Sequence, residues 1–242
     1  MARKVLRSLA KEFNRRPEQD NAHEAFAAKV AIREKVLEGM GDRASHVLDC
    51  FAGSGKMHKA VWQRAMSYAA CDERFFFDKR HAFVCDNRLL LRAIDLEPYN
   101  VFDLDAYGSP WEQALIIARR RVVDLGERVG VVLTEGSSIK IKFGSLPFAM
   151  AELAGVPHDA AGVSKNQNMI RGQAVTGMAM AMGCRIVKHF EAAGKTGSRV
   201  IYIGLVLEGL PAAAGVPDFP RGSVRTKKAD AGVLSPAPAS AV

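Results

Sequence analysis

Short apolar runs that recur at regular intervals constrain the fold of this chain more than any other feature. They occupy residues 46–51, 66–72, 81–86, 99–105 and 129–135. The stretches between these runs are long enough for helices or crossovers. Alternation of strands with helices predicts an α/β fold, with a mostly parallel sheet covered on both faces.

The pattern changes near the end of the chain. Two further apolar runs, residues 184–191 and 198–208, are separated only by the stretch "AAGKTG". A parallel crossover needs a dozen or more residues, so these two strands are expected to pair as an antiparallel hairpin.

The chain of 242 residues is long enough for about one large domain. Residues 1–43 are expected to form a basic N-terminal helical extension, in which the first seventeen or so residues serve equally well as a nucleic-acid-binding arm or a solvated amphipathic helix. Residues 44–210 are expected to hold the sheet. Residues 211–242, rich in Pro, Ala, Gly and Ser without periodicity, are expected to be a disordered tail.

Charge and composition limit the kinds of partner, cellular location and cysteine site that this chain can have. The formal net charge is +8 with a pI near 9.5, which favours a polyanionic partner. The absence of a long apolar run and the charges near the N-terminus predict a cytoplasmic protein without a membrane segment. The four cysteines lie far apart without a C-x-x-C pair, so neither a metal site nor a disulfide scaffold is expected.

The first apolar run continues into a glycine turn, "VLDCFAGSG", residues 47–55. Small residues at the carboxyl end of a strand allow a ligand to approach the main chain closely. The dinucleotide fingerprint G-x-G-x-x-G is not met because no third glycine follows, and the P-loop pattern G-x-x-x-x-G-K-[ST] is absent.

This stretch resembles the first motif of class I S-adenosylmethionine-dependent methyltransferases, in the D-x-F-A-G-S-G form found among nucleic-acid amino-methyltransferases. The resemblance implies a Rossmann-like, seven-stranded sheet and S-adenosyl-L-methionine as cofactor. Asp49 and the backbone of residues 53–55 would hold the methionine end of that cofactor. The cofactor-binding residues predicted in this motif are Asp49, Phe51, Ala52, Gly53, Ser54 and Gly55.

Acidic residues lie at the ends of the next two runs, in the order that the resemblance requires. Asp72, with Glu73 as the alternative, is predicted to accept hydrogen bonds from ribose hydroxyls. Asp86 is assigned to the adenine amino group, with Asn87 beside it. Both assignments are implied by the family pattern.

The fourth run, "NVFDLDAYGSP", spans residues 100–110 and resembles the D-x-D-P-F/Y-G-S-P motif of the tRNA guanine-N2 methyltransferase family. Ala106 replaces the proline of that motif, which leaves a backbone N–H and a less restricted φ. The resemblance predicts as catalytic residues Asp105, Tyr107, Ser109 and Pro110.

The chemistry explains these residue types. The lone pair of an exocyclic amine on a nucleobase is delocalised into the ring, so the amine is a poor nucleophile. A carboxylate at Asp105 that accepts its protons would aim the lone pair at the methyl group. The ring of Tyr107 would stack on the base.

The resemblance covers residues 44–208 and implies transfer of a methyl group to an exocyclic amino nitrogen of a nucleobase. Guanine N2 in RNA is the first candidate for this substrate. RNA is thus favoured over DNA as partner, and a DNA adenine-N6 or cytosine-N4 methyltransferase is the alternative. An inactive nucleic-acid-binding relative, or a small-molecule or protein methyltransferase, stays open. Methylation of a cytosine carbon is disfavoured because no cysteine lies at the catalytic position. Substrate choice is expected to depend on the long stretch 136–171.

Overall fold

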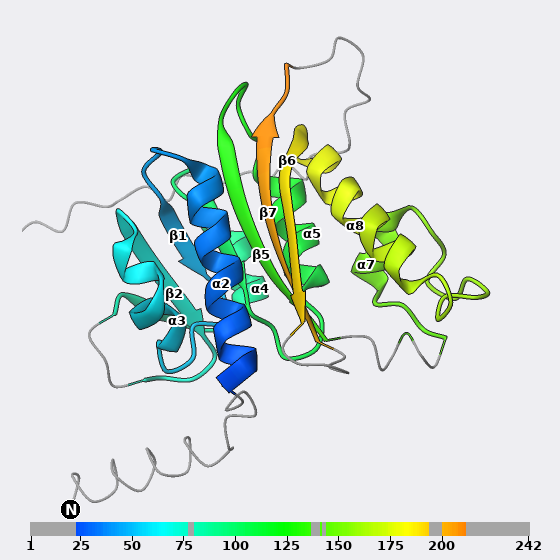
Figure 1. Ribbon diagram of the computed structural model, residues 1–242, viewed down its shortest axis with the longest axis horizontal. Coiled ribbons are helices and arrows are strands. Elements are labelled where there is room, and N and C mark those ends of the chain that lie inside the picture. Colours follow the sequence, from blue (N-terminus) through cyan, green and yellow to red (C-terminus); the bar gives the residue numbers. More distant parts are fainter. Residues whose placement is uncertain (1–22, 77–79, 137–140, 142–143, 194–199, 212–242) are drawn as a thin grey trace, which may run out of the picture.

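The described part of the chain forms a single sheet flanked by helices (Figure 1). The structure is a computed structural model that describes residues 23–76, 80–136, 141, 144–193 and 200–211. The strands are β1 (His46–Asp49), β2 (Ser67–Asp72), β3 (Ala82–Val84), β4 (Val101–Leu104), β5 (Arg128–Glu135), β6 (Cys184–Ala193) and β7 (Ile201–Gly209). The helices are α2 (His23–Met40), α3 (Lys56–Ala60), the 3-10 helix η1 (Trp62–Arg64), α4 (Asn87–Ala93), α5 (Trp111–Arg120), α7 (Phe148–Ala154) and α8 (Gln167–Ala181).

The strands follow the order β3-β2-β1-β4-β5-β7-β6 across the seven-stranded sheet. Strands β1 to β5 pair in parallel, whereas β7 runs antiparallel to both β5 and β6. This arrangement confirms the predicted parallel sheet and its terminal antiparallel hairpin. The carboxyl ends of β1 and β4 therefore lie side by side, which brings the glycine turn next to the predicted catalytic motif.

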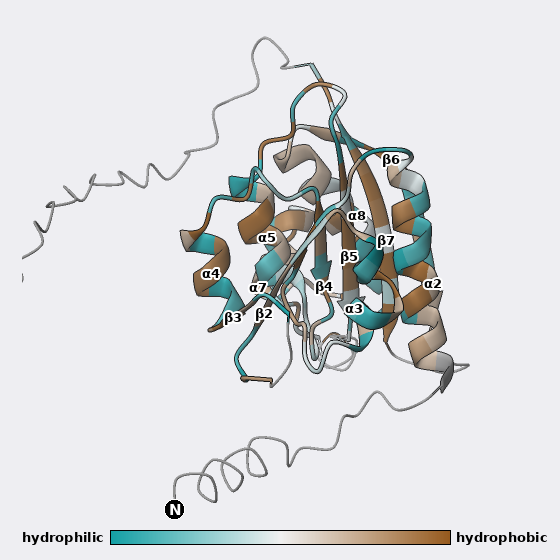
Figure 2. Cartoon of the chain, turned by 90° about the vertical axis from the view of Figure 1, so that its left-hand side faces the viewer, coloured by the Kyte–Doolittle hydropathy of each residue, from teal (hydrophilic) through white to brown (hydrophobic). Residues whose placement is uncertain are grey.

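Each face of the sheet buries its own apolar cluster. Val47 and Val101 pack with the apolar residues of α2, while the residues that follow them, Leu48 and Phe102, pack with α4, α5, α7 and α8. Successive side chains of a strand point to opposite faces, and a strand buried on both faces reads as a continuous apolar run. Figure 2 shows the strands between α2 on one side and α4 and α5 on the other.

Helix α2 packs against two glycines of the sheet that leave space for its side chains. A Cβ on Gly130 would lie 2.7 Å from a methyl group of Val36, and a Cβ on Gly204 would lie 2.8 Å from the other methyl group and 3.0 Å from Ile32. Gly130 belongs to β5 and Gly204 to β7, so one side chain of α2 occupies the space that both glycines leave open. The predicted boundary at residue 43 stays a prediction, but α2 packs directly on this sheet.

One connection is shorter than the sequence suggested. Residues 73–81 join β2 to the parallel strand β3, and the described residues among them contain no helix. Residues 1–22 and 212–242, to which the basic arm and the tail were assigned, lie outside the described residues. Within the described ranges, no helix is both long enough and apolar enough to cross a membrane.

Candidate active site

The glycine turn joins β1 to α3 through backbone that favours glycine. Gly53 has φ of +45° and Gly55 has φ of +79°, in the left-handed region where other L residues are strained. The N–H of Ala52 donates to the carbonyl of Cys71 at 3.1 Å, which ties the turn to β2. A tight turn with little side-chain bulk therefore lies at the carboxyl edge of the sheet.

Asp49 ends β1 and is buried beneath this turn. Its carboxylate accepts hydrogen bonds from the hydroxyl of Tyr68 at 2.9 Å and from the N–H of Phe51 at 3.2 Å. Burial and the nearby charge of Asp103 raise the pKa of Asp49 to about 8, although Arg33 opposes the shift. A cation bound at this edge would favour the ionised form of Asp49.

Asp72 ends β2 and connects the glycine turn to the neighbouring strand. One carboxylate oxygen accepts from the N–H of Gly53 at 2.9 Å, and the other accepts from the N–H of Arg74 at 2.9 Å. A carboxylate offers about four acceptor sites, so Asp72 retains capacity for hydroxyl donors. Glu73, the alternative, is exposed.

Asp86 and Asn87 lie at the start of α4, where they have different partners. Asp86 caps the helix by accepting from the N–H of Arg88 at 2.8 Å and forms an ion pair with the same residue at 2.5 Å. Hydrogen bonds from Arg88 lower the pKa of Asp86. Asn87 is buried, donates to the carbonyl of Cys50 at 2.7 Å and accepts from Gln113 at 2.8 Å. Its side chain thus joins the residue that follows β1 to α5.

Asp103 is the register partner of Asp49 on the adjacent strand and is fully buried. Arg33 of α2 donates to both of its carboxylate oxygens at 2.7 Å, and the indole N–H of Trp62 donates to one of them at 2.7 Å. These bonds pair a buried carboxylate with a buried guanidinium from a helix that precedes the sheet in sequence.

Asp105, two residues further along, is the predicted catalytic acid. Its carboxylate accepts from the hydroxyl of Thr134 at 2.7 Å and forms ion pairs with Lys29 at 3.0 Å and Arg33 at 3.3 Å. Burial disfavours the charge of Asp105, but Arg33 and Lys29 outweigh burial and lower its pKa. The side chain of Asp105 is 13% exposed.

The loop after Asp105 exposes its aromatic ring. Tyr107 is 75% exposed, whereas Pro110 is buried at the start of α5 and Ser109 is partly buried. The carbonyl of Gly108 accepts from the N–H of Gly136 at 2.6 Å, so the end of β5 contacts this loop.

Ala106, at the position of the motif proline, uses the group that proline would lack. Its N–H donates to the carbonyl of Leu104 at 2.9 Å, and its side chain is 6% exposed. The local turn is thus held by a backbone hydrogen bond rather than by a ring.

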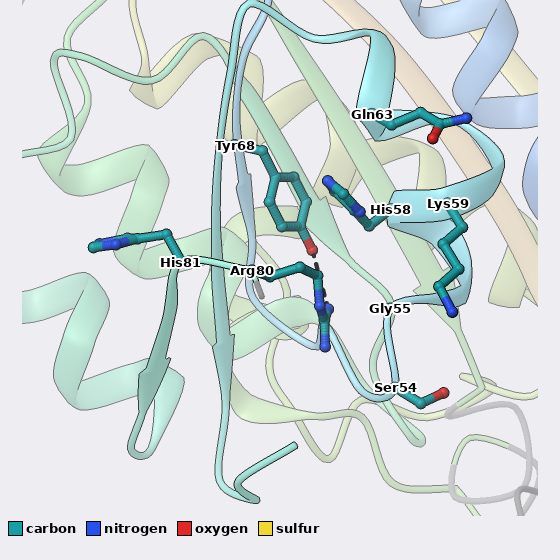
Figure 3. Close-up of a pocket in the computed structure, with 8 residues that line it drawn as sticks. All are labelled: Ser54, Gly55, His58, Lys59, Gln63, Tyr68, Arg80 and His81. Carbon is teal, nitrogen blue, oxygen red and sulfur yellow. Dashed lines mark hydrogen bonds between the residues drawn. The ribbon is translucent and has the colours of Figure 1, made fainter. Parts of the chain in front are cut away.

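A cavity of about 410 Å³ lies beside the glycine turn (Figure 3). Arg80 projects into it and donates to the carbonyl of Ala52 at 3.1 Å and to that of Gly53 at 2.6 Å. The cavity is lined by Ser54, Gly55, His58, Lys59, Gln63, Tyr68, Arg80 and His81. Ser54 and Gly55 of the predicted cofactor motif line this cavity, whereas none of the acids at the ends of β1, β2 and β4 does.

Several residues that sequence reasoning missed contribute to the site. Lys29, Arg33, Trp62 and Thr134 all contact Asp103 or Asp105. The i, i+4 spacing of Lys29 and Arg33 places both on one face of a helix, a signal that the sequence contains. The four cysteines are free, and the described residues contain no cluster of His, Cys, Asp and Glu that fits a metal ion.

No family model and no curated protein matches this sequence, but solved structures share its fold. Trm1 from Pyrococcus horikoshii, solved with S-adenosyl-L-methionine, aligns with a TM-score of 0.50 at 13% identity, over 80% of this chain and 58% of that chain. The N-methyltransferase NodS from Bradyrhizobium japonicum, solved with S-adenosyl-L-homocysteine, aligns with a TM-score of 0.50 at 9% identity, over 85% of this chain and 98% of that chain. This chain therefore spans little more than half of Trm1. Its fold is the Rossmann-like fold of the class I S-adenosylmethionine-dependent methyltransferases.

Proposed function

We propose that this chain is an S-adenosyl-L-methionine-dependent methyltransferase that acts on an exocyclic amino nitrogen of a nucleobase, with guanine N2 in RNA as the first candidate. The observation that carries the proposal is the position of Asp105. Its charged carboxylate lies at the end of β4, beside the glycine turn of β1, and the exposed ring of Tyr107 follows it.

The residues present fit the cofactor by their chemistry. Gly53 and Gly55 keep side chains off the turn, Asp72 offers acceptor oxygens for hydroxyl groups, and Asp49 would gain a favourable charge interaction with a cation. Asp86 offers acceptors beside the predicted adenine position, while the amide of Asn87 already has two protein partners. When bound, S-adenosyl-L-methionine supplies an electrophilic methyl group on a sulfonium.

The chain's own residues would orient the amine and receive its proton. Asp105 would accept hydrogen bonds from the amino group, which turns the nitrogen lone pair toward the methyl group. The lowered pKa of Asp105 makes it a weak base, but a methylated aromatic amine that still carries its extra proton is strongly acidic. Tyr107 would stack on the base, a contact worth about 1–3 kcal/mol.

The second candidate is a DNA adenine-N6 or cytosine-N4 methyltransferase, because Asp49 and residues 51–55 match the glycine motif that those enzymes share. RNA is placed first because Gly108, Ser109 and Pro110 continue the motif after the acid and the aromatic residue. A small-molecule or protein substrate, and an inactive nucleic-acid binder, are the remaining alternatives. A soluble cytoplasmic location is part of the proposal.

The test is transfer of labelled methyl from S-adenosyl-L-methionine to total tRNA, ribosomal RNA and unmodified genomic DNA in parallel, followed by identification of the nucleoside. Label in N2-methylguanosine is expected, and label in a DNA base would select the second candidate. Asp105→Asn should still bind the cofactor in calorimetry while transfer falls about 100-fold or more. Full activity of Asp105→Asn would exclude the role proposed for this carboxylate.

A further inference from the structure

Helix α2 contacts the carboxylate of Asp105, although the sequence pattern assigned this helix to an extension outside the catalytic domain. Lys29 and Thr134 approach the same oxygen, at 3.0 Å and 2.7 Å, and Arg33 approaches the other at 3.3 Å. Lys29 and Arg33 are also joined to each other, because Arg33 donates to the carbonyl of Lys29 at 2.9 Å. One turn of α2 therefore holds both oxygens of the predicted catalytic acid.

These two cations are themselves buried, which is costly for a charge without partners. The Lys29 side chain is 6% exposed and its ammonium lies 5.8 Å from the ring centre of Tyr202 on β7. Arg33 is fully buried and pairs with Asp103 of β4 as well. Two buried cations thus converge on carboxylates at the substrate edge of the sheet.

Other acidic groups lie in the same cluster. Asp103 on β4 is the register partner of Asp49 at the end of β1, and its charge contributes to the raised pKa of Asp49. Glu135, next to Thr134 on β5, is buried and accepts a hydrogen bond from Trp111. At Asp105 itself, the cations of α2 oppose the effect of burial.

We propose that Lys29 and Arg33 are positioning residues that keep the Asp105 carboxylate ionised and oriented toward the amine, so that helix α2 belongs to the catalytic apparatus. This inference rests on the proposed function. A protonated Asp105 would present a donor in place of one acceptor to an amine whose hydrogens need acceptors, so loss of the charge would weaken the orienting contact. Thr134 adds the third direction from which the carboxylate is held.

The test compares Lys29→Met with Lys35→Met, an exposed lysine on the same helix. Lys29→Met should keep cofactor affinity in calorimetry, and the acid limb of its pH profile for kcat/KM should move to higher pH. A shift of one pH unit would lower activity roughly tenfold on that limb while alkaline activity recovers. Lys35→Met should leave the profile unchanged. A uniform loss at every pH would overturn the proposal, because a merely structural role predicts that result.

A second measurement does not depend on turnover. The pKa of the Asp105 carboxyl can be followed by carbon NMR in the free protein, with the resonance assigned by Asp105→Asn. Lys29→Met should raise this pKa and Lys35→Met should not, and an unchanged pKa would overturn the inference. If the wild type transfers no methyl group to any pool while this pKa still rises, the proposed function fails although the charge pairing stands.

Discussion

The two halves of the predicted cofactor edge hold their carboxylates in different ways. At β1 and β4, Asp49 and Asp103 are buried and depend on partners from α2, η1 and β2. At the ends of β2 and β3, Asp72 and Asp86 are only partly buried, and most of their partners are a few residues away in sequence. The aspartates of the first half are therefore held by residues distant in sequence, whereas those of the second half are held mainly by near neighbours in sequence.

This difference decides how much each half depends on the rest of the fold. A buried carboxylate that loses its partner leaves an uncompensated charge, whereas a partly exposed one is solvated by water. The β1–β4 half should respond strongly to a distant substitution, and the β2–β3 half should not.

The largest expected effect comes from Arg33→Met. This change leaves the buried carboxylate of Asp103 with the indole N–H of Trp62 and no guanidinium, and we expect a loss of about 3–5 kcal/mol in the free energy of unfolding. Urea unfolding measures the loss. Arg64→Met is the control, because its ion pair with Glu34 is exposed and should contribute below about 1 kcal/mol. Equal losses in the two variants would remove the contrast between buried and exposed pairs.

An effect of intermediate size concerns the pH dependence of stability, which should have opposite signs in the two halves. The raised pKa of Asp49 means that the folded state retains a proton that the unfolded state has lost. Its contribution is therefore full below about pH 4 and is lost as the pH rises to about 8. The pKa of Asp86 is lowered, so its contribution is present above the ordinary pKa and is lost in acid.

Urea midpoints across the pH range would test these signs. Asp49→Asn should flatten the fall in stability between about pH 5 and 8, and Asp86→Asn should flatten only the fall in acid. Identical pH profiles for wild type and Asp49→Asn would show that Asp49 does not carry the raised pKa.

The smallest expected effect is that of Ala106→Pro, which tests a local backbone contact within the β1–β4 half. The substitution removes the hydrogen bond from the N–H of Ala106 to Leu104, and we expect a loss of about 0.5–1.5 kcal/mol. Ala106→Gly retains the N–H and serves as the control for the bond, with urea unfolding as the measurement. A proline variant more stable than wild type would show that the ring suits this turn better than the hydrogen bond does.

Sequence reasoning succeeded where the signal is local. Asp49, Asp72 and Asp105 were predicted from the ends of apolar runs, and the structure places them at one edge because the strands are parallel. The mostly parallel sheet followed from the alternation of apolar runs with longer stretches, and the terminal hairpin followed from the short connection between the last two runs. The assignment of cofactor and catalytic roles to these residues stays a prediction.

The missing part of the site depends on long-range contacts. Arg33 and Asp103 are separated by 70 positions in sequence, and no pattern around either residue identifies the other. Asn87 was chosen because it follows Asp86, yet its amide bonds to Cys50 and Gln113 inside the fold. Adjacency in sequence does not reveal whether a polar side chain points to a ligand or to the protein.

The glycines that face α2 also affect how Lys29 is positioned relative to Asp105. Val36 packs against Gly130 and Gly204, which fixes the position of α2 along its axis. Lys29 lies about two turns away on the same helix. Sliding the helix by a single residue would move the ammonium by about 1.5 Å, beyond contact with Asp105. The two glycines in the middle of the sheet thus fix the position of α2, and with it the position of the Lys29 ammonium at the edge of the sheet.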